Sequence, residues 1–394
     1  MPRIQASTAL SRLRVLDLTR VRAGPVCARH FADFGADVIK IETTGDEDLG
    51  GARHGPDFQS LHRNKRSMTL DLKAAAGIGI FRDLVRTADV VIENYRPDVK
   101  DRLGIDYQSL RAINPRIVLA SISGFGQDGP YRDRAGFDQI AQGLCGIMSV
   151  TGFPEQGPLR AGAAVADVTA GLLAALGIMT ALHERDQTGE GQWVQSNLLQ
   201  AGITLLDFQA ARYTMSGEVP AAVGNDHPTS MPTSAYRTAD GHLNVAASGS
   251  VMWQRLCDAI GRPELVKDER FAKAELRAAN RSALADELNA ALSKRRSAEW
   301  VELLNAAGVP CGPIYAMDEV FADPQVKHLQ ATASVEHPTL GTLNILNQPI
   351  RLSRTPAALV TATPERGDHT DEVLGELGLD AAQIARLRAD KVVI

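Results

Sequence analysis

One carboxylate in this sequence, that of Asp167, lies in a context that could make it a catalytic nucleophile. Asp167 follows a run of small residues, 161–166, and precedes an apolar, Ala- and Gly-rich segment, 168–182, that predicts a buried helix. Two interpretations of this residue are open. Asp is a common helix N-cap, because its side-chain oxygen accepts a free N–H of the first turn. A carboxylate held in a tight apolar cleft can also serve as a nucleophile.

Basic residues flank the carboxyl ends of several predicted strands. They are Lys65, Arg66, Lys73, Arg96 and Arg102. Such groups bind phosphates and other anions together with helix N-termini, and elsewhere they form a solvated charged surface. The charge pattern alone leaves both interpretations open.

Other familiar catalytic patterns are missing from the sequence. It contains neither Gly-x-Ser-x-Gly nor His-Glu-x-x-His, and its four cysteines show no Cys-x-x-Cys spacing. We therefore expect no Ser-His-Asp triad, no metal and no disulfide framework. The dinucleotide fingerprint Gly-x-Gly-x-x-Gly is also absent.

The elements that must position Asp167 are typical of an α/β fold. Residues 13–18 and 36–42 predict strands on either side of a helix that begins near Pro25, a unit that builds parallel sheets. Further strands are expected at 88–94 and 116–123, an extended segment at 68–73, and a helix at 77–87. Polar or glycine-rich loops follow these strands, and ligands bind at that edge of an open α/β sheet.

The second half of the chain predicts a smaller domain. A turn at 187–192 leads into an expected long helical region, 194–213. Residues 233–237 and 242–247 predict a hairpin around Asp240-Gly241. We therefore expect a large domain from residues 1–190 and 316–394, a linker helix region at 191–224, and a small α+β domain at 225–315.

Composition excludes several classes of protein. Of 394 residues 44% are hydrophobic and 23% are charged, which excludes disordered and collagen-like chains. A net charge of −5 gives no electrostatic footprint for nucleic acid. The first residues lack the apolar core of a secretory signal, and the longest apolar run is shorter than a membrane span. We expect a soluble cytoplasmic protein with no membrane or nucleic-acid partner.

Taken together, the motifs resemble those of the class III CoA transferases. They cover nearly the whole chain in order: 15–19, 23–25, 35–42, 63–67, 91–97, 123–130, 161–167, 188–192, 309–313 and 369–374. The resemblance implies a large Rossmann-like α/β domain whose parallel sheet is built from both chain ends, together with a smaller domain. It also implies an interlocked homodimer, an acyl-CoA substrate and a free carboxylic acid, and no metal.

The resemblance also implies roles for individual residues. The catalytic carboxylate falls on Asp167, which attacks the thioester to give a mixed anhydride and then carries CoA as an enzyme-bound thioester. CoA-contacting segments match Val21, Leu70, Lys73, Asn94, Tyr95, Arg96 and Arg102. Arg22 stands where formyl-CoA transferase has a glutamine. Its guanidinium could hold a dicarboxylate through two parallel bonds, and the alternative is that Arg22 contacts CoA or points to solvent. The glycine loop that covers the active site of that enzyme has no counterpart here, and the nearest short loop contains Ser248 and Gly249.

One position separates the activities found in this family. Racemases of the family have Gly-His-Asp, whose His exchanges a proton, whereas this chain has Gly136-Phe137-Asp138. Phe137 cannot carry a proton, which favours CoA transfer. Thr43 also departs from the family pattern, because a basic residue is expected there. The pattern favours succinyl-CoA or a similar donor, and a racemase or a CoA-binding protein without turnover remain the alternatives.

Overall fold

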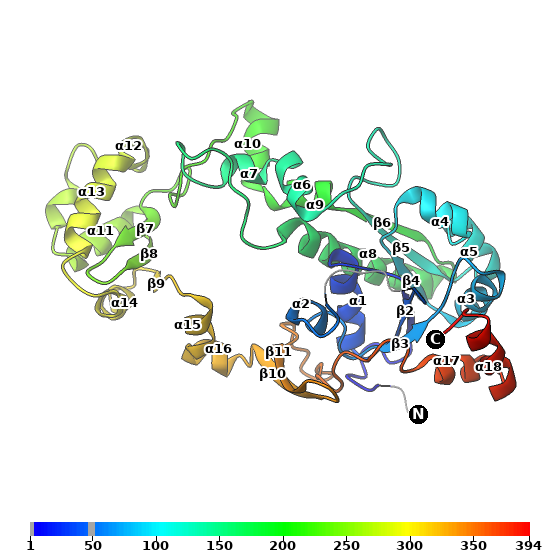
Figure 1. Ribbon diagram of the computed structural model, residues 1–394. Coiled ribbons are helices and arrows are strands. Elements are labelled where there is room, and N and C mark those ends of the chain that lie inside the picture. Colours follow the sequence, from blue (N-terminus) through cyan, green and yellow to red (C-terminus); the bar gives the residue numbers. More distant parts are fainter. Residues whose placement is uncertain (1–3, 46–51) are drawn as a thin grey trace. The chain divides into compact units, whose positions relative to one another are not determined.

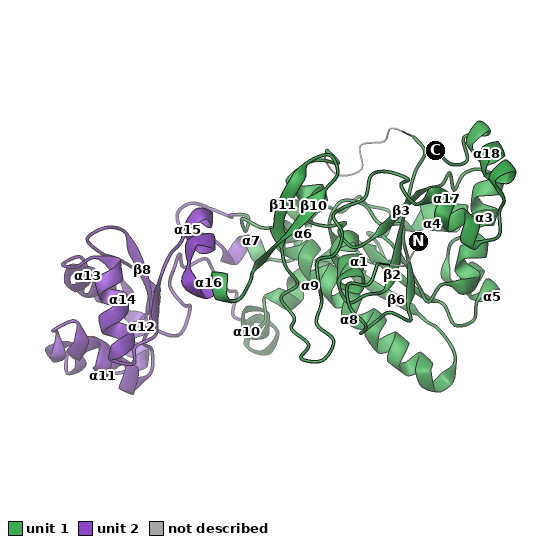
Figure 2. Ribbon diagram, turned by 90° about the horizontal axis from the view of Figure 1, so that it is seen from below, with its two compact units in different colours: residues 1–147, 160–216, 327–394 green, residues 148–159, 217–326 purple. Residues whose placement is uncertain are grey.

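The computed structural model describes residues 4–45 and 52–394, in two compact units (Figure 2). Residues 1–3, part of the stretch without a secretory signal, and 46–51, part of the loop before the third strand, lie outside the described residues. The larger unit comprises residues 1–147, 160–216 and 327–394. The smaller unit comprises residues 148–159 and 217–326.

A parallel sheet of six strands forms the centre of the larger unit. Its order is β3-β2-β1-β4-β5-β6, and every neighbouring pair is parallel. The strands are β1 (Arg14–Asp17), β2 (Asp37–Glu42), β3 (Arg66–Thr69), β4 (Val90–Glu93), β5 (Val118–Ser123) and β6 (Trp193–Asn197). The inner strands are buried on both faces, as expected when helices cover both sides of a parallel sheet.

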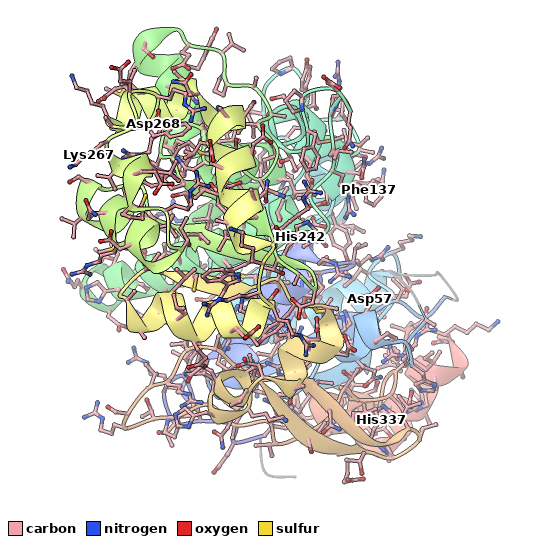
Figure 3. All side chains as sticks on the ribbon, turned by 90° about the vertical axis from the view of Figure 1, so that its left-hand side faces the viewer. Asp57, Phe137, His242, Lys267, Asp268 and His337 are labelled. Carbon is pink, nitrogen blue, oxygen red and sulfur yellow. The ribbon has the colours of Figure 1, made fainter. Side chains whose placement is uncertain are left out.

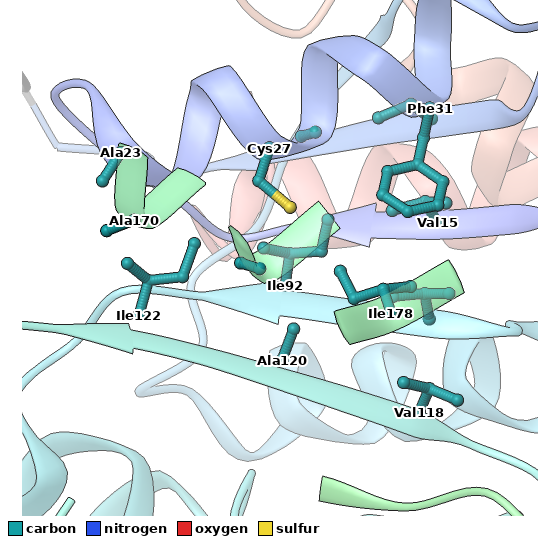
Figure 4. Packing of buried hydrophobic residues seen from close by; sticks show 14 of the residues in the cluster. Val15, Ala23, Cys27, Phe31, Ile92, Val118, Ala120, Ile122, Ala170 and Ile178 are labelled. Atoms are coloured by element: carbon teal, nitrogen blue, oxygen red, sulfur yellow. The ribbon is translucent and has the colours of Figure 1, made fainter. Parts of the chain in front are cut away.

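Two layers of helices enclose this sheet (Figure 1). On one face α1 (Ala23–Asp33) and α8 (Val165–Thr188) pack on alternate strand residues such as Val15 and Ile92 (Figure 4). The opposite face is covered by α3 (Ala75–Thr87), α5 (Tyr107–Ile113), α17 (Thr370–Glu376) and α18 (Ala381–Ala389). The other elements of this unit are α2 (Pro56–Gln59), α4 (Pro97–Leu103), α6 (Asp138–Leu144), α9 (Leu198–Leu205), α10 (Phe208–Ser216), β10 (Thr332–His337) and β11 (Gly341–Leu346).

The smaller unit has its own antiparallel sheet and apolar core. The predicted hairpin forms β7 (Thr233–Arg237) and β8 (His242–Ala246), to which β9 (Cys311–Pro313) adds. Trp253, Phe271 and Trp300 are buried in the core beneath it. Its helices are α11 (Ser250–Ala259), η1 (Pro263–Val266), α12 (Ala274–Ala279), α13 (Arg281–Leu292), α14 (Ser297–Ala306) and α15 (Met317–Ala322). The short helices α7 (Ile147–Val150) and α16 (Pro324–His328) include residues where the chain passes between the units.

The basic residues around β3 are structural. The Lys65 ammonium is completely buried 2.8 Å from an Asp17 carboxylate oxygen. Arg66 makes two hydrogen bonds to Asp37, of 2.9 and 2.8 Å, and a third to Glu376 of α17. Both interpretations of Lys65 and Arg66, as anion ligands and as part of a solvated charged surface, are therefore wrong, because both residues are buried and carboxylates of this chain already pair with them.

The sequence predicts a wholly buried helix at 168–182, but only one side of helix α8 is buried. Its Ala170 and Ile178 face the sheet, but Leu172 and Leu176 are 45% and 64% exposed. By length and composition it could cross a membrane, with a mean hydropathy of 1.8. The helix nevertheless packs along one side on α1 and the sheet, as the core helix of an α/β unit does.

Several expectations about the architecture are wrong. Residues 194–213 do not form one long helix, because Trp193–Asn197 pairs with β5 as the sixth strand. The expected linker is therefore largely part of the larger unit, which extends to residue 216 and resumes at 327 instead of 316. Residues 148–159 belong to the smaller unit. All strands of the parallel sheet lie between residues 14 and 197, so the C-terminal end adds helices and the hairpin β10–β11, and no strand of this sheet.

Candidate active site

Asp167 lies in the first turn of α8 without capping it. The helix begins at Val165 and its N-cap position is Ala164, so Asp167 is the third helical residue. The capping oxygen comes from Asp138, whose Oδ1 accepts the backbone N–H groups of Ala166 and Asp167 at 2.9 and 3.2 Å. The N-cap interpretation of Asp167 is therefore wrong. Within residues 4–45 and 52–394, no group donates a hydrogen bond to the Asp167 carboxylate, which is free to react.

Asp138 is held in turn by contacts of its own. Gln142 donates a hydrogen bond from Nε2 to Asp138 Oδ2 at 2.6 Å, and Arg160 Nη2 lies 3.7 Å from the same oxygen. The segment before it approaches the end of β5 closely, since a Cβ added to Gly136 would come within 2.5 Å of the Gly124 Cα. The neighbouring Phe137 leaves its side chain 61% exposed (Figure 3). The Gly-Phe-Asp triplet therefore positions Asp167 through Asp138.

The surroundings of Asp167 disfavour its charged form. Partial burial and the nearby Asp138 carboxylate raise the pKa of Asp167 from 3.8 to about 6, against the opposing effect of Arg22. A poorly solvated carboxylate is more reactive than one in water, and it is still ionised at neutral pH. A perturbed carboxyl in such a position is a functional candidate on physical grounds.

Helix α1 brings Arg22 close to this carboxylate. Arg22 is the N-cap residue of α1, and the next residue, Ala23, packs against α8 (Figure 4). Gly171, one helical turn beyond Asp167, permits this approach, because an added Cβ would come 2.4 Å from the Ala23 carbonyl oxygen. Sequence spacing alone could not show that these two segments meet.

A cleft of about 410 Å³, lined by both polar and apolar side chains, lies at the carboxyl ends of the strands. Two of the predicted CoA contacts, Lys73 and Tyr95, line it together with Thr43 and Arg20. The Arg20 guanidinium lies 5.5 Å from the Tyr95 ring centroid. Sequence reasoning missed Arg20, although its place just after the first strand is a signal that could have found it. The cleft offers a cation, an aromatic ring and hydroxyls for a nucleotide-like ligand.

The other predicted CoA contacts occupy different positions. Leu70 is buried in the apolar core, and Val21 is 44% exposed with a positive φ of 64°. The Asn94 side chain makes two hydrogen bonds to the backbone of Arg20. Its Oδ1 accepts from the Arg20 N–H at 2.9 Å, and its Nδ2 donates to the Arg20 carbonyl oxygen at 2.8 Å. Arg96 and Arg102 are exposed at either end of α4, 3.5 and 3.8 Å from Asp98 oxygens. Asn94 therefore positions the loop after β1, which carries Arg20 to Arg22.

Ser248 and Gly249 lie in the smaller unit, in the loop that precedes α11. The Ser248 carbonyl oxygen accepts a hydrogen bond of 2.7 Å from the buried Arg277. Arg277 also donates hydrogen bonds to the Met231 and Phe271 carbonyl oxygens, so its guanidinium holds this loop and the neighbouring backbone in place.

One cluster of the larger unit has metal-ligating side chains that the sequence analysis did not single out. Ligand atoms of His54, His337 and Glu365 lie within 4.8 Å of one another. However, His337 Nδ1 accepts the backbone N–H groups of Thr339 and Leu340. His54 Nε2 lies 2.8 Å from Glu365 Oε1, so these groups already have partners within the fold. We assign the cluster to hydrogen bonding within the fold.

Known proteins are similar to this sequence over almost its full length. A model of the CoA-transferase family III matches residues 10–370. "Succinyl-CoA--D-citramalate CoA-transferase" of Chloroflexus aurantiacus is 36% identical, over 98% of both chains. "Succinate--glutarate CoA-transferase" of Agrobacterium fabrum is 38% identical, over 93% of this chain and 95% of its own.

Solved structures show the same fold. A "CAIB/BAIF family protein from Brucella suis" superimposes with a TM-score of 0.83 at 37% identity, covering 94% of this chain and all of its own. Rv3272 from M. tuberculosis gives the same TM-score at 30% identity, over 92% of this chain and 98% of its own.

Proposed function

This chain belongs to CoA-transferase family III, and from this premise we propose that it moves CoA from a dicarboxylic acyl-CoA, such as succinyl-CoA, to another free carboxylic acid. The observation that carries the proposal is the unpaired, poorly solvated carboxylate of Asp167. The relatives' names add support for the substrate class, because several name succinyl-CoA or succinate together with a second dicarboxylate.

The proposed reaction begins at the donor thioester. An oxygen of Asp167 attacks the thioester carbonyl carbon, the C–S bond breaks, and CoA leaves as the thiolate with an acyl aspartyl anhydride formed. The thiolate then attacks the aspartyl carbonyl of that anhydride. This step releases the donor acid as its carboxylate and leaves CoA bound to Asp167 as a thioester.

The acceptor reverses these steps. Its carboxylate attacks the aspartyl thioester carbonyl, which expels the thiolate and forms a second anhydride. The thiolate attacks the acceptor's acyl carbon, giving the new acyl-CoA and regenerating the Asp167 carboxylate. Every intermediate is hydrolysable, so water must be kept away. The side chains of residues 161–166 before Asp167 carry no polar group that would bind water there.

CoA itself is assigned to the cleft lined by Lys73 and Tyr95, with its thiol end directed towards Asp167. Lys73 is exposed and suited to a phosphate, and Tyr95 offers a flat ring. Arg96 and Arg102 at the ends of α4 are further phosphate partners. Arg22 is assigned to the distal carboxylate of a dicarboxylic substrate, because its guanidinium fork matches a carboxylate. Ser248 and Gly249 are proposed to contact the substrate.

Phe137 favours transfer over racemisation. It occupies the position where family racemases carry the proton-exchanging His, and no other His adjoins Asp138 in the sequence. A phenyl ring can neither remove nor return an α-proton. We therefore propose that this chain has little or no racemase activity.

We also propose that two copies of this chain form the interlocked homodimer implied by the family. The exposed apolar residues of α8, including Leu172 and Leu176, form a surface that a second copy would cover. A cytoplasmic location without membrane or nucleic-acid partners remains the expectation from the sequence.

The decisive test incubates the enzyme with succinyl-CoA and a panel of carboxylic acids. New CoA esters in the wild type, and their loss in Asp167→Ala, support the proposal. Exchange of α-deuterium in a branched acyl-CoA without transfer would instead identify a racemase. Tight CoA binding without either reaction would identify a binding protein, and full transfer by Asp167→Ala would refute the mechanism.

A further inference from the structure

Arg22 makes an ion pair at the surface beside the candidate nucleophile. Its Nη2 lies 3.0 Å from Oδ1 of Asp57, in the first turn of α2. The Arg22 side chain is 30% exposed and that of Asp57 is 75% exposed. Figure 3 labels Asp57. This is a single contact between one nitrogen and one oxygen, whereas a guanidinium can hold a carboxylate through two parallel bonds.

The location of Arg22 connects this pair to Asp167. The N-terminus of α1 approaches α8 at Gly171, one turn from Asp167, and Arg22 is close enough to act on the Asp167 charge. By contrast, Asp57 extends to the solvent side of the same guanidinium. Arg22 therefore stands between two carboxylates of its own chain, one reactive and one exposed.

We propose that Asp57 is a specificity-determining residue that competes with the distal carboxylate of a dicarboxylic substrate for Arg22. This inference rests on the proposed function, in which Arg22 binds that distal carboxylate. Asp57 already accepts a hydrogen bond from Nη2, and this nitrogen belongs to both bidentate edges of a guanidinium, so a substrate carboxylate that binds Arg22 through two parallel bonds competes with Asp57 for it. A monocarboxylate makes no such demand.

The competition between Asp57 and the substrate carboxylate for Arg22 should have only a small effect on binding. Exposed ion pairs contribute little, because water solvates both partners well and their side chains lose entropy on pairing. Displacing Asp57 therefore weakens dicarboxylate binding by about two- to fivefold, as expected for an exposed pair. In return, Asp57 keeps the Arg22 charge paired at the surface, where it would otherwise attract unrelated anions.

The test compares acceptors of equal chain length. KM is measured for glutarate and pentanoate with the wild type, Asp57→Asn, Arg22→Gln and the double variant, at saturating succinyl-CoA. We expect Asp57→Asn to increase the ratio of pentanoate KM to glutarate KM by about two- to fivefold. In the Arg22→Gln background the same change should leave this ratio as it was.

Asp83→Asn is the matched control, because Asp83 also pairs with an arginine at the surface, 3.3 Å from Arg86 on α3. It should not alter the ratio. A decrease of the ratio in Asp57→Asn would overturn the proposal, since Asp57 would then orient Arg22 for substrate. An unchanged ratio in Asp57→Asn, with a lower one in Arg22→Gln, would refute the competition and leave the proposed function standing. An unchanged ratio in Arg22→Gln would refute the Arg22 contact on which both depend.

Discussion

Replacing Asp138 with asparagine should separate its two effects on Asp167. The carboxylate caps α8 through two backbone N–H groups, and its charge raises the pKa of Asp167. Asparagine retains a neutral oxygen for the cap, but its amide N–H₂ would face Gln142 Nε2, which now donates a bond of 2.6 Å. The change therefore removes a charge and one hydrogen bond without removing the capping oxygen.

The size of the effect follows from these contacts. Losing one charge-assisted hydrogen bond and weakening two others costs about 1 to 2 kcal/mol of the free energy of unfolding. If the same amount is lost from the alignment of Asp167, the rate at the pH optimum falls about tenfold. In the opposite direction, removal of the like charge lowers the Asp167 pKa. The acid limb of the pH profile, near 6 in the wild type, should move to lower pH.

The assay measures initial rates of CoA ester formation between about pH 4.5 and 8.5, with urea unfolding in parallel. Asp83→Asn, on the exposed side of α3, serves as the control for a lost surface carboxylate. An acid limb that stays in place or moves to higher pH would refute the electrostatic reasoning. A normal rate together with normal stability would refute the positioning role of Asp138.

Three further changes probe other parts of the larger unit. Asp167→Asn should abolish transfer yet stabilise the fold by up to about 3 kcal/mol near pH 8, because burial raises this pKa above its unfolded value and ionisation then costs stability. That gain should nearly vanish by about pH 3, below the unfolded pKa, where the group is mostly protonated in both states, and urea titrations at the two pH values check it. Lys73→Ala should raise KM for the acyl-CoA about five- to tenfold through loss of a phosphate contact, with KM for the acceptor acid as the internal comparison. Asp33→Asn should cost about 3 to 5 kcal/mol in urea unfolding, because it breaks a buried pair with Arg63 at 2.9 and 2.7 Å, and a loss below 1 kcal/mol would contradict that role.

The local elements were predictable because their signals are local. The first strand–helix–strand unit, the hairpin around Asp240-Gly241 and the placement of Asp167 at the start of a helix all follow from nearby residues. The family resemblance is confirmed by the match to residues 10–370. By contrast, β6 has the sequence Trp-Val-Gln-Ser-Asn, too short and too polar to stand out from the helical residues after it.

The missed features all depend on residues distant in sequence. The cap of α8 comes from Asp138, 28 and 29 residues before the N–H groups it binds. Lys65 and Arg66 read as surface cations because their partner carboxylates are 48 and 29 residues away. The pairing of Arg22 with Asp57 likewise spans 35 residues. A sequence pattern shows that such groups are charged, and only the fold shows which charges meet.

Contacts of β3 and of the residues just before it with the C-terminal part of the chain affect when the larger unit can fold. Arg66 binds Glu376, 310 residues later, and the Asn64 side chain binds the backbone of Ala358, 294 residues later. During synthesis these side chains therefore find their partners only after residues 358 and 376 have been made. The residues of the smaller unit lie between these partners in sequence, so they leave the ribosome before residues 358 and 376 do. We expect the larger unit to complete its folding only after synthesis ends, which makes it the slow step and the target of any C-terminal truncation.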